Sequence, residues 1–504
     1  MKHLALLLIL SSFVSPAPSF AAEQRPNVLF IAVDDLRTSL GCYGDTLVKS
    51  PNIDRFAATA RRFEHAYTQQ AVCGPSRTSL LTGRLPDNTR VWHNRNLFRD
   101  TQPDIVTLPQ LFKNHGYHTI SLGKIFSGDE RELDPVSWSE PEILKQKGWK
   151  NSALGDSGSE GKGAAWEAAD VPDEGYPDGK LARLAVEKLT SLQSGGKPFF
   201  LAVGFFKPHL PFNAPKRYWD LYDPATFDLK DAGQRVKGIS EHAHHSHREL
   251  GGYRDMPKDE HLDAATTRTL RHGYHACVSY TDAHIGKLLA ALDQLGLAQN
   301  TIVVLWGDHG WSLGEKDRWC KGTNFERDTR VPLMVRVPSM AKPGVPTRAL
   351  VETVDIYLTL AALAGLMPPA DLDGRSFVPV LQDPEARGRD AVLSQFNRPW
   401  KPDTFASMGY TLRTATQRYT RWVEWPSRKT ITEEFYDYTS KQSATREGAM
   451  LIEQENVIAD PAHAESLNQL RAKMGETLTT RIKTKAEESL VKDSPVTKKK
   501  KKNQ

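Results

Sequence analysis

The chain has 504 residues, of which 39% are hydrophobic and 25% charged. This composition is typical of globular proteins and excludes disordered, collagenous and membrane-embedded classes. Its 66 basic and 61 acidic residues give a net charge of +5, and a run at residues 498–502 supplies five of the lysines. Since the rest of the chain is nearly neutral, we expect no nucleic-acid binding by bulk charge, and a disordered lysine-rich tail at residues 491–504.

The first residues predict a secretory signal peptide over residues 1–22. Lys2 and His3 precede an apolar run at residues 4–10, and small residues come before Glu23. The apolar run is too short to span a bilayer, although a membrane anchor is the alternative interpretation. No later segment has 18 unbroken apolar residues. We therefore expect an exported protein, periplasmic or secreted, without stable membrane insertion.

Four apolar runs predict strands that are buried on both faces of a parallel sheet. They cover residues 28–33, 118–122, 198–206 and 301–306. Helical periodicity appears between them, for example at residues 181–192 and 274–295. Alternating strands and helices predict an α/β fold with a large, mostly parallel sheet flanked by helices.

Polar side chains follow each of the four runs. In chain order they are Asp34 and Asp35, then Lys124, then His209, then Asp308 and His309. The carboxyl ends of parallel strands meet at one edge of the sheet, so we expect these groups to lie together. Each alone would also fit a turn, a helix cap or a solvated lysine. Three carboxylates and an imidazole at one edge predict a bound divalent cation, calcium or magnesium rather than zinc.

The stretch AVCGPSRTSLLTGR, residues 71–84, places a cysteine beside a predicted helix. Residues 77–83 fit a short helix ended by Gly83, with Cys73 just before its start. A helix N-terminus and the nearby Arg77 favour a thiolate and bind an oxyanion. A thiolate is nevertheless a poor ligand for a hard cation, so the residues alone leave the role of Cys73 open.

The other three cysteines do not indicate a disulfide framework. Cys42, Cys277 and Cys320 are widely separated in a chain that is long enough to bury its own core. If Cys73 has a chemical role, at most one bridge can form among them. The alternative is that they are small buried residues.

A second, smaller domain is predicted at residues 389–490, after a larger one at residues 23–388. The sequence PEARGR, residues 384–389, is typical of a linker, and strand-like runs such as residues 418–425 precede a helical stretch at 462–474. This order favours an antiparallel sheet with a packed helix. An insertion at residues 221–263 carries a histidine-rich tract, which we interpret as a surface loop rather than a metal site; its histidines are His242, His244, His245 and His247.

Residues 73–77, Cys-Gly-Pro-Ser-Arg, resemble the Cys-x-Pro-Ser-Arg signature of type I sulfatases. Five further segments match in family order: NVLFIAVDDLRTSLGCYG (27–44), GYHTISLGK (116–124), FKPHLPF (206–212), GDHGWSLGE (307–315) and MGYTLRTATQRY (408–419). The third and the last resemble the iduronate-2-sulfatase branch in particular. The resemblance implies an alkaline-phosphatase-like fold, with the catalytic domain at residues 23–388.

The resemblance also implies a modified nucleophile and a set of site residues. In this family a formylglycine-generating enzyme oxidises the signature cysteine to formylglycine (3-oxoalanine), whose hydrate attacks sulfur with one hydroxyl and expels sulfate with the other. One Ca2+ would be held by Asp34, Asp35, Cys73, Asp308 and His309. The other implied residues are Arg77, orienting the hydrate; Lys124 and Lys321, on the sulfate oxygens; His209, the general acid; and Trp311 and Lys401, contacting substrate.

The implied reaction is removal of sulfate from a sulfated oligosaccharide or polysaccharide, with a uronate 2-O-sulfate as the preferred substrate and Lys401 against its carboxylate. Two positions depart from the family pattern: Ser127 stands where a histidine is usual, and Gly322 where the iduronate enzyme has a tyrosine. An ulvan-type algal polysaccharide is an alternative substrate. Two other functions also remain open, namely a phosphatase or phosphonate monoester hydrolase of the same fold, and a non-catalytic binder of sulfated glycans.

Overall fold

A computed structural model describes residues 25–127, 133–145, 150–155, 163–244, 249–258, 262–402, 404–439 and 452–483. The predicted signal peptide and lysine-rich tail lie outside the described residues, as do His245 and His247 of the histidine-rich tract.

The described residues build a central sheet of eight strands in the order β10-β2-β11-β7-β1-β5-β3, with β12 paired to β2. The four predicted strands form its core and pair in parallel: β1 (Asn27–Val33), β3 (His118–Gly123), β5 (Phe199–Phe205) and β7 (Thr301–Gly307). Every residue of β1, β5 and β7 is buried, which explains their unbroken apolar sequences.

Four strands that the sequence analysis did not identify extend this sheet on the β7 side. They are β2 (Arg61–Tyr67), β10 (Arg330–Val331), β11 (Leu333–Arg336) and β12 (Thr347–Glu352). β10 and β11 run antiparallel to β2, and β12 runs parallel to it. The sheet is therefore mixed beyond β7. It is parallel through β7, β1, β5 and β3, whose carboxyl ends lead to the predicted site residues.

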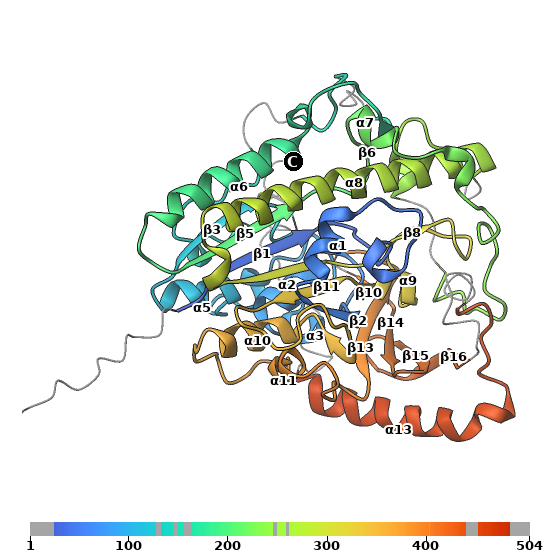
Figure 1. The fold of residues 1–504 in the computed structure, drawn as a ribbon. Helices are drawn as coiled ribbons and strands as arrows, with labels where there is room; N and C mark the ends of the chain where they lie inside the picture. The colour runs from blue at the N-terminus through green and yellow to red at the C-terminus, as the bar shows by residue number, and fades with distance from the viewer. Residues whose placement is uncertain are drawn as a thin grey trace, which may run out of the picture.

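Helices cover both faces of the sheet (Figure 1). On one face lie α1 (Pro51–Ala57), α6 (Pro177–Gln193) and α8 (Ala264–Gln294); on the other lie α2 (Cys73–Thr82), α5 (Leu108–Asn114), α10 (Asp355–Leu363) and α11 (Val378–Gln382). In α6, Leu181, Ala185 and Leu189 recur every four residues and are buried, as the helical periodicity predicted. The remaining short elements are α3 (Pro86–Thr89), α4 (Phe98–Thr101), α7 (Lys216–Trp219), α9 (Glu326–Thr329), β4 (Trp166–Glu167), β6 (Phe212–Asn213), β8 (Ser312–Leu313) and β9 (Trp319–Cys320).

A second, antiparallel sheet follows in the C-terminal part, at the lower right of Figure 1. Its strands are consecutive in order: β13 (Val392–Arg398), β14 (Ser407–Arg413), β15 (Gln417–Glu424) and β16 (Thr430–Asp437). The last helix, α13 (Ala464–Arg481), places Leu470 and Met474 in one hydrophobic cluster with Leu393 and Tyr410 of the sheet. The α/β fold with a smaller antiparallel sheet is the predicted architecture.

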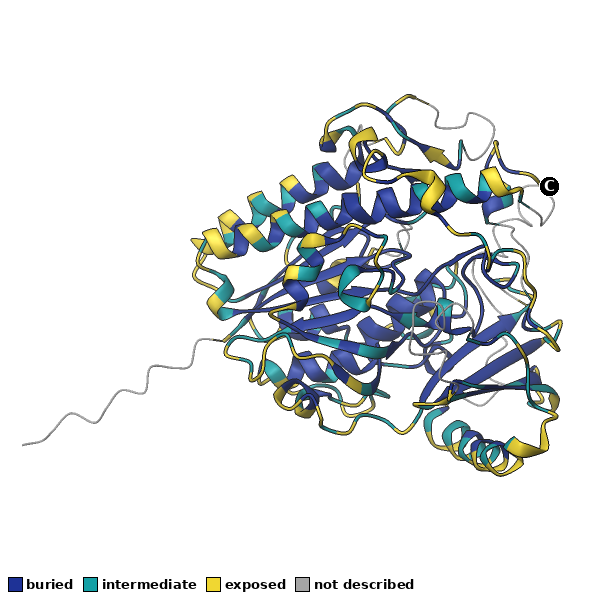
Figure 2. Cartoon of the chain, turned by 45° about the vertical axis from the view of Figure 1, so that its right-hand side comes forward, coloured by how far each residue is buried: buried dark blue, intermediate teal, exposed yellow. Residues whose placement is uncertain are grey.

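Buried residues occupy the strands of both sheets and the inward sides of the helices, and exposed residues line the outer sides of the helices (Figure 2). All four cysteines are free thiols; Cys42 is half-buried and the others are buried. Within the described ranges, none of the helices is both long enough and apolar enough to span a bilayer.

Candidate active site

The polar groups that follow the parallel strands lie together at one edge of the central sheet. β1 pairs with β5 on one side and β7 on the other, so Asp34 and Asp35 emerge between the other strand ends. Lys124 Nζ, after β3, lies 2.5 Å from Asp34 Oδ2, and the backbone N–H of Asp35 donates to Asp308 Oδ1 at 2.9 Å. His309 Nε2 lies 3.2 Å from Asp35 Oδ1. All five residues are buried.

Cys73 faces this cluster from the start of α2. Its Sγ lies 3.3 Å from His309 Nε2 and 3.5 Å from Asp34 Oδ1. The helix begins at Cys73 itself, four residues earlier than predicted, because Pro75 needs no hydrogen bond in a first turn. Gly83 ends it with a φ of 67°, as predicted.

The structure adds a factor that the sequence left open, the burial of the Cys73 thiol. Burial and the neighbouring Asp34 carboxylate raise the pKa of the thiol to about 12, although Lys124 and Lys321 act in the opposite direction. Desolvation of a fully enclosed sulfur therefore outweighs the helix N-terminus and the basic residues. Burial thus makes the Cys73 thiol harder to ionise and weakens it as a nucleophile.

Arg77, one turn further along α2, ties the strand ends to one another. Its Nε donates to Asp308 Oδ2 at 2.8 Å and its Nη2 to Asp34 Oδ1 at 3.2 Å. Its Nη1 donates to the carbonyls of Lys124 and Ile125, just after β3. The guanidinium is completely buried, so these contacts fix the relative positions of α2, β1, β3 and β7.

A metal ion fits the carboxylate end of this cluster. Ligand atoms of Asp34, Asp35, Cys73 and His309 all lie within 4.8 Å of one another. Burial raises the pKa of Asp35 well above its usual value, although Lys321 acts in the opposite direction. Burial also acts to raise the pKa of Asp34, but the positive charges of Lys124, His209 and Arg77 hold that pKa well below its usual range. Asp35 is thus a buried carboxylate that a cation would stabilise.

Asp308, the fifth predicted ligand, is less available to an ion than the other four. Its Oδ1 accepts backbone N–H groups of Asp35 and His309, and its Oδ2 accepts from Arg77. The same Oδ2 lies 3.6 Å from His309 Nε2, so the carboxylate still borders the cluster.

Lys321 and His209 lie on the Asp35 side, together with a glutamate that the sequence analysis left out. Lys321 Nζ is 3.0 Å from Asp35 Oδ1 and 3.2 Å from Glu249 Oε1, and it sits 4.8 Å from the centre of the Trp311 ring. His209 Nε2 is 3.4 Å from the same Glu249 oxygen. Burial, and then Lys321, lower the pKa of His209 to about 3. Glu249 belongs to the insertion that we interpreted as a surface loop.

The two predicted substrate contacts differ in position. Trp311 is completely buried and packs beneath Lys321 and His209, where it supports both. Lys401 is exposed between β13 and β14, and no described site residue lies within hydrogen-bond distance of it. Ser127 lines a cavity of about 190 Å³ that adjoins Lys124 and His209. Gly322 accepts a hydrogen bond from Arg398 through its carbonyl.

His242 and His244, the described histidines of the histidine-rich tract, do not join the cluster. His242 Nδ1 is 3.2 Å from Ser407 Oγ, and its ring packs 5.7 Å from that of Trp422, so it docks on the C-terminal sheet rather than lying free on the surface. Neither His242 nor His244 belongs to any group of potential metal ligands among the described residues.

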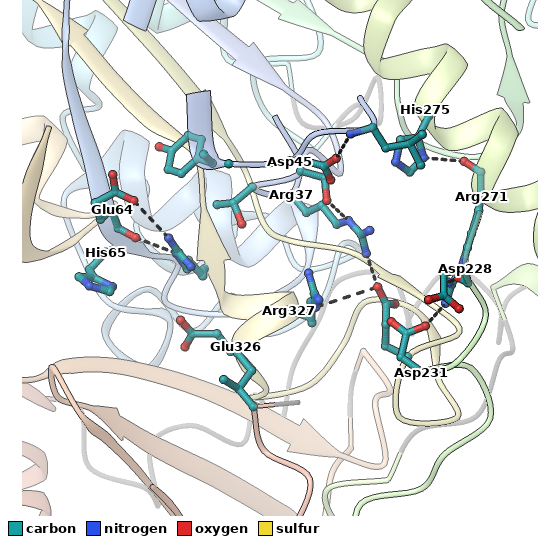
Figure 3. A pocket seen from close by; sticks show the side chains of 18 of the residues that line it. Arg37, Asp45, Glu64, His65, Asp228, Asp231, Arg271, His275, Glu326 and Arg327 are labelled. Carbon is teal, nitrogen blue, oxygen red and sulfur yellow. Dashed lines mark hydrogen bonds and ion pairs between the residues drawn. The ribbon is translucent and has the colours of Figure 1, made fainter. Parts of the chain in front are cut away.

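A larger cavity, of about 620 Å³, lies outside the cluster and is lined by charged side chains (Figure 3). Two of its arginines are already paired: Arg37 Nη1 lies 2.6 Å from Glu315 Oε1, and Arg271 Nη2 lies 2.9 Å from Asp231 Oδ1. None of the predicted site residues lines it. Size alone therefore does not mark the reaction site, and the convergence of strand ends does.

Fold and site together define an enzyme of the alkaline-phosphatase-like class. The family model described as Sulfatase matches residues 26–366, more than half of the chain, and the chain belongs to this family. A second model, N-sulphoglucosamine sulphohydrolase, C-terminal, matches residues 307–480. The predicted sulfatase resemblance and enzyme class are confirmed.

Two relatives support the predicted branch. Iduronate 2-sulfatase of Mus musculus is 36% identical over 501 residues, which cover 84% of this chain and 90% of that protein. The protein of the same name from Homo sapiens is 35% identical over 472 residues, covering 79% of this chain and 85% of that one. The chain is therefore iduronate-2-sulfatase-like.

Solved structures establish the fold but not the reaction. A phosphonate monoester hydrolase of Agrobacterium radiobacter aligns with a TM-score of 0.72 at 21% identity, covering 91% of this chain and 96% of that one. A 2-O GAG sulfatase aligns with a TM-score of 0.68 at 22% identity, covering 91% and 93%. At such identities the same fold hosts different chemistry, so the substrate has to be argued from the site.

Proposed function

We propose that the enzyme removes the 2-O-sulfate of a uronic acid in a sulfated glycan, using a formylglycine made from Cys73. The observation that carries this proposal is the position of Cys73 at the start of α2, with Sγ 3.5 Å from Asp34 and 3.3 Å from His309. Burial raises the pKa of the Cys73 thiol, which makes the unmodified cysteine a weak nucleophile. Conversion to an aldehyde replaces it with an oxygen, which suits a hard cation.

We assign the ligand set to one Ca2+, held by Asp34, Asp35, His309 and the oxygen that replaces Cys73 Sγ, with Asp308 at the border. Carboxylate-rich, oxygen-dominated ligation favours calcium over zinc. A bound calcium would supply positive charge that activates the hydrate and stabilises anionic oxygens. Asp35, whose pKa burial raises, supports the assignment.

The chain's own residues supply the remaining steps. The ammonium groups of Lys124 and Lys321 lie on either side of the Asp34–Asp35 pair, where they can bind sulfate oxygens and stabilise the charge that develops as the S–O bond breaks. His209 Nδ1 lies 2.5 Å from the carbonyl of Leu210, which fixes its ring and leaves Nε2 facing the site. Without substrate the pKa of His209 is lowered to about 3, so the bound sulfate group would first have to favour the imidazolium, and Nε2 would then protonate the leaving sugar oxygen.

Arg77 holds Asp34 and Asp308 in place for this chemistry rather than contacting substrate. The hydrate of the formylglycine would provide one hydroxyl to attack sulfur and a second to expel sulfate. Maturation requires a formylglycine-generating enzyme, and the predicted signal peptide would deliver the protein to the periplasm or exterior.

A phosphatase mechanism on the same fold is disfavoured by one contact. Asp35, His209 and Glu249 form a second group of potential ligands, as a two-metal phosphatase would need. The Lys321 ammonium, however, lies 3.0 Å from Asp35 and 3.2 Å from Glu249 and already neutralises both carboxylates. The described residues therefore offer ligands for one metal ion, whereas many phosphatases use two.

Mass spectrometry of the peptide spanning residues 71–84 tests the nucleophile. We expect loss of the Cys73 sulfur and an aldehyde that a hydrazide probe captures. Cys73→Ala should reduce sulfate-ester hydrolysis to the uncatalysed background, whereas Cys42→Ala, a half-buried thiol away from the site, should not. Full turnover by an enzyme with unmodified Cys73, or faster hydrolysis of a phosphate ester than of its matched sulfate ester, would contradict the proposal.

A further inference from the structure

The 190 Å³ cavity extends the candidate active site in one direction. Asp34, Lys124 and His209 form the part of its wall that belongs to the site. The rest of the wall includes Lys145 and Lys207, neither of which has a role in the proposed mechanism. A group held between Lys124 and His209 therefore has direct access to a space lined by two further lysines.

Lys145 reaches this cavity because its segment continues the central sheet beyond β3. Ile143 forms an isolated parallel bridge with Leu122, its N–H donates to Ser121 O at 3.2 Å, and its carbonyl accepts from Gly123 N at 2.8 Å. The segment thus runs beside β3 in the same direction. Lys145 therefore follows this segment at the same edge of the sheet where Lys124 follows β3, and where the other site residues follow β1, β5 and β7.

The three ammonium groups on this cavity differ in how they are compensated. Lys124 is paired with Asp34, and Lys207 Nζ donates to the carbonyls of His209 at 2.7 Å and Pro211 at 2.6 Å. Lys145 is exposed and lies 5.0 Å from the centre of the Phe206 ring; among the described residues, no carboxylate is within ion-pair distance of its Nζ.

The carboxylates on the cavity are already engaged elsewhere. Asp178 accepts the backbone N–H groups of Phe206 at 3.0 Å and Lys207 at 2.8 Å, and Asp34 is held by Lys124 and Arg77. Although the side chain is exposed overall, partial desolvation lowers the pKa of Lys145, and the charges of Lys207 and Lys124 add to this. A bound anion would counter the contribution of these two cations.

We propose that this cavity is a second anion-binding subsite, in which Lys145 binds another negatively charged group of the glycan whose sulfate ester is cleaved. The group is a carboxylate or a further sulfate, since either offers the oxygens that an ammonium group binds. The inference rests on the proposed sulfatase reaction and adds a specificity determinant to it. Lys145 touches the substrate away from the breaking bond, so it affects binding rather than the chemical step.

The test compares Lys145→Gln, Lys145→Arg and the control Lys150→Gln in the full-length, matured enzyme. Lys150 is an exposed lysine of the same connecting segment that does not line the cavity. Four substrates are used: 4-nitrophenyl sulfate, a 2-O-sulfated uronate disaccharide, its carboxyl-reduced form, and the disaccharide with a second sulfate. Lys145→Gln should raise KM about tenfold for a substrate with the second anion, with kcat within twofold.

Lys145→Arg should restore the wild-type KM, and Lys150→Gln should not change it. An effect that disappears on carboxyl reduction identifies the carboxylate as the group bound; one that appears only with the second sulfate identifies that sulfate. Equal losses on all four substrates, or no loss on any, would overturn the subsite while aryl sulfate turnover still supports the sulfatase reaction. If the wild-type enzyme hydrolyses no sulfate ester at all, both proposals are overturned.

Discussion

Among individual residues, Arg77 shows how one buried side chain can hold together groups from several elements. Its planar guanidinium reaches Asp308, Asp34 and the carbonyl of Ile125 from a single position. Lysine carries the same charge on a single nitrogen at the end of a flexible chain, so it cannot reproduce the fixed directions in which the guanidinium meets Asp34 and Asp308. The geometry of the ligand cluster therefore depends on the shape of this side chain as well as on its charge.

Arg77→Lys should lower kcat/KM for a sulfate ester by about a hundredfold, since one charge-assisted hydrogen bond to each carboxylate, at about 1.5 kcal/mol each, is lost. Steady-state kinetics on the purified variant measure this. Arg84→Lys is the matched control, because Arg84 lies just after the same helix and pairs with the exposed Asp371. Wild-type kcat/KM in Arg77→Lys would show that the arginine does not position the carboxylates.

At the level of secondary-structure elements, Glu352 at the end of β12 connects the central sheet to the C-terminal part. Arg481, the last residue of α13, pairs with both of its oxygens, at 2.7 and 2.6 Å. Arg389 of the predicted linker lies 3.5 Å away, and the N–H of Leu393 in β13 donates to it at 2.7 Å. The predicted linker is thus anchored by ion pairs, and one completely buried carboxylate joins three separate elements.

Glu352→Gln should destabilise the protein by about 3 kcal/mol at pH 7, because two arginines lose their buried partner. Burial alone would raise the pKa of Glu352, but Arg389 and Arg481 lower it to about 2. A depressed folded-state pKa stabilises the protein above the unfolded-state value of about 4.5. The difference from wild type should therefore be full at pH 7 and shrink as the pH falls from about 4.5 towards 2. Urea unfolding at pH 7, 4.5 and 3 measures it.

Glu385→Gln, an exposed glutamate of the same linker, provides the comparison and should leave stability within about 0.5 kcal/mol at every pH. An unchanged difference between wild type and Glu352→Gln from pH 7 to 3 would exclude the ion pairs as its source.

The sequence predicted elements well where one physical constraint dominated. Residues 28–33 and 301–306 are buried on both faces, and only unbroken apolar runs satisfy that. β2 was missed because its sequence RRFEHAY is rich in charge. Arg61 is nevertheless buried, and its Nη2 donates to the carbonyls of Ala341 and Leu381, which lie far away in the chain. Glu249 was missed because its partners are also distant in the chain, and only folding brings it to His209 and Lys321.

For the whole molecule, the candidate metal cluster joins distant parts of the chain. Asp34 and Asp35 follow β1, Cys73 starts α2, and His309 follows β7. A bound ion would therefore link strands β1 and β7 of the central sheet to helix α2, which covers one face of that sheet. Any ligand that binds only the folded state stabilises it by mass action. The proposed Ca2+ should therefore be a stability determinant of the whole catalytic domain, independently of turnover.

Chelation should lower the midpoint of thermal unfolding, and added Ca2+ should restore it in a concentration-dependent way, with about 2.7 kcal/mol gained at a hundredfold excess over Kd.

Asp35→Asn is the decisive comparison. Without calcium this variant should be less stable than the wild type, because the buried Lys321 ammonium loses its partner at 3.0 Å. With calcium it should gain far less than the wild type, because it has lost a charged ligand. Scanning calorimetry of both proteins, with and without chelator, measures the four midpoints. Equal calcium shifts in the two proteins would place the ion elsewhere, and a larger shift with Zn2+ than with Ca2+ would overturn the choice of metal, since oxygen-rich ligation cannot favour the softer ion.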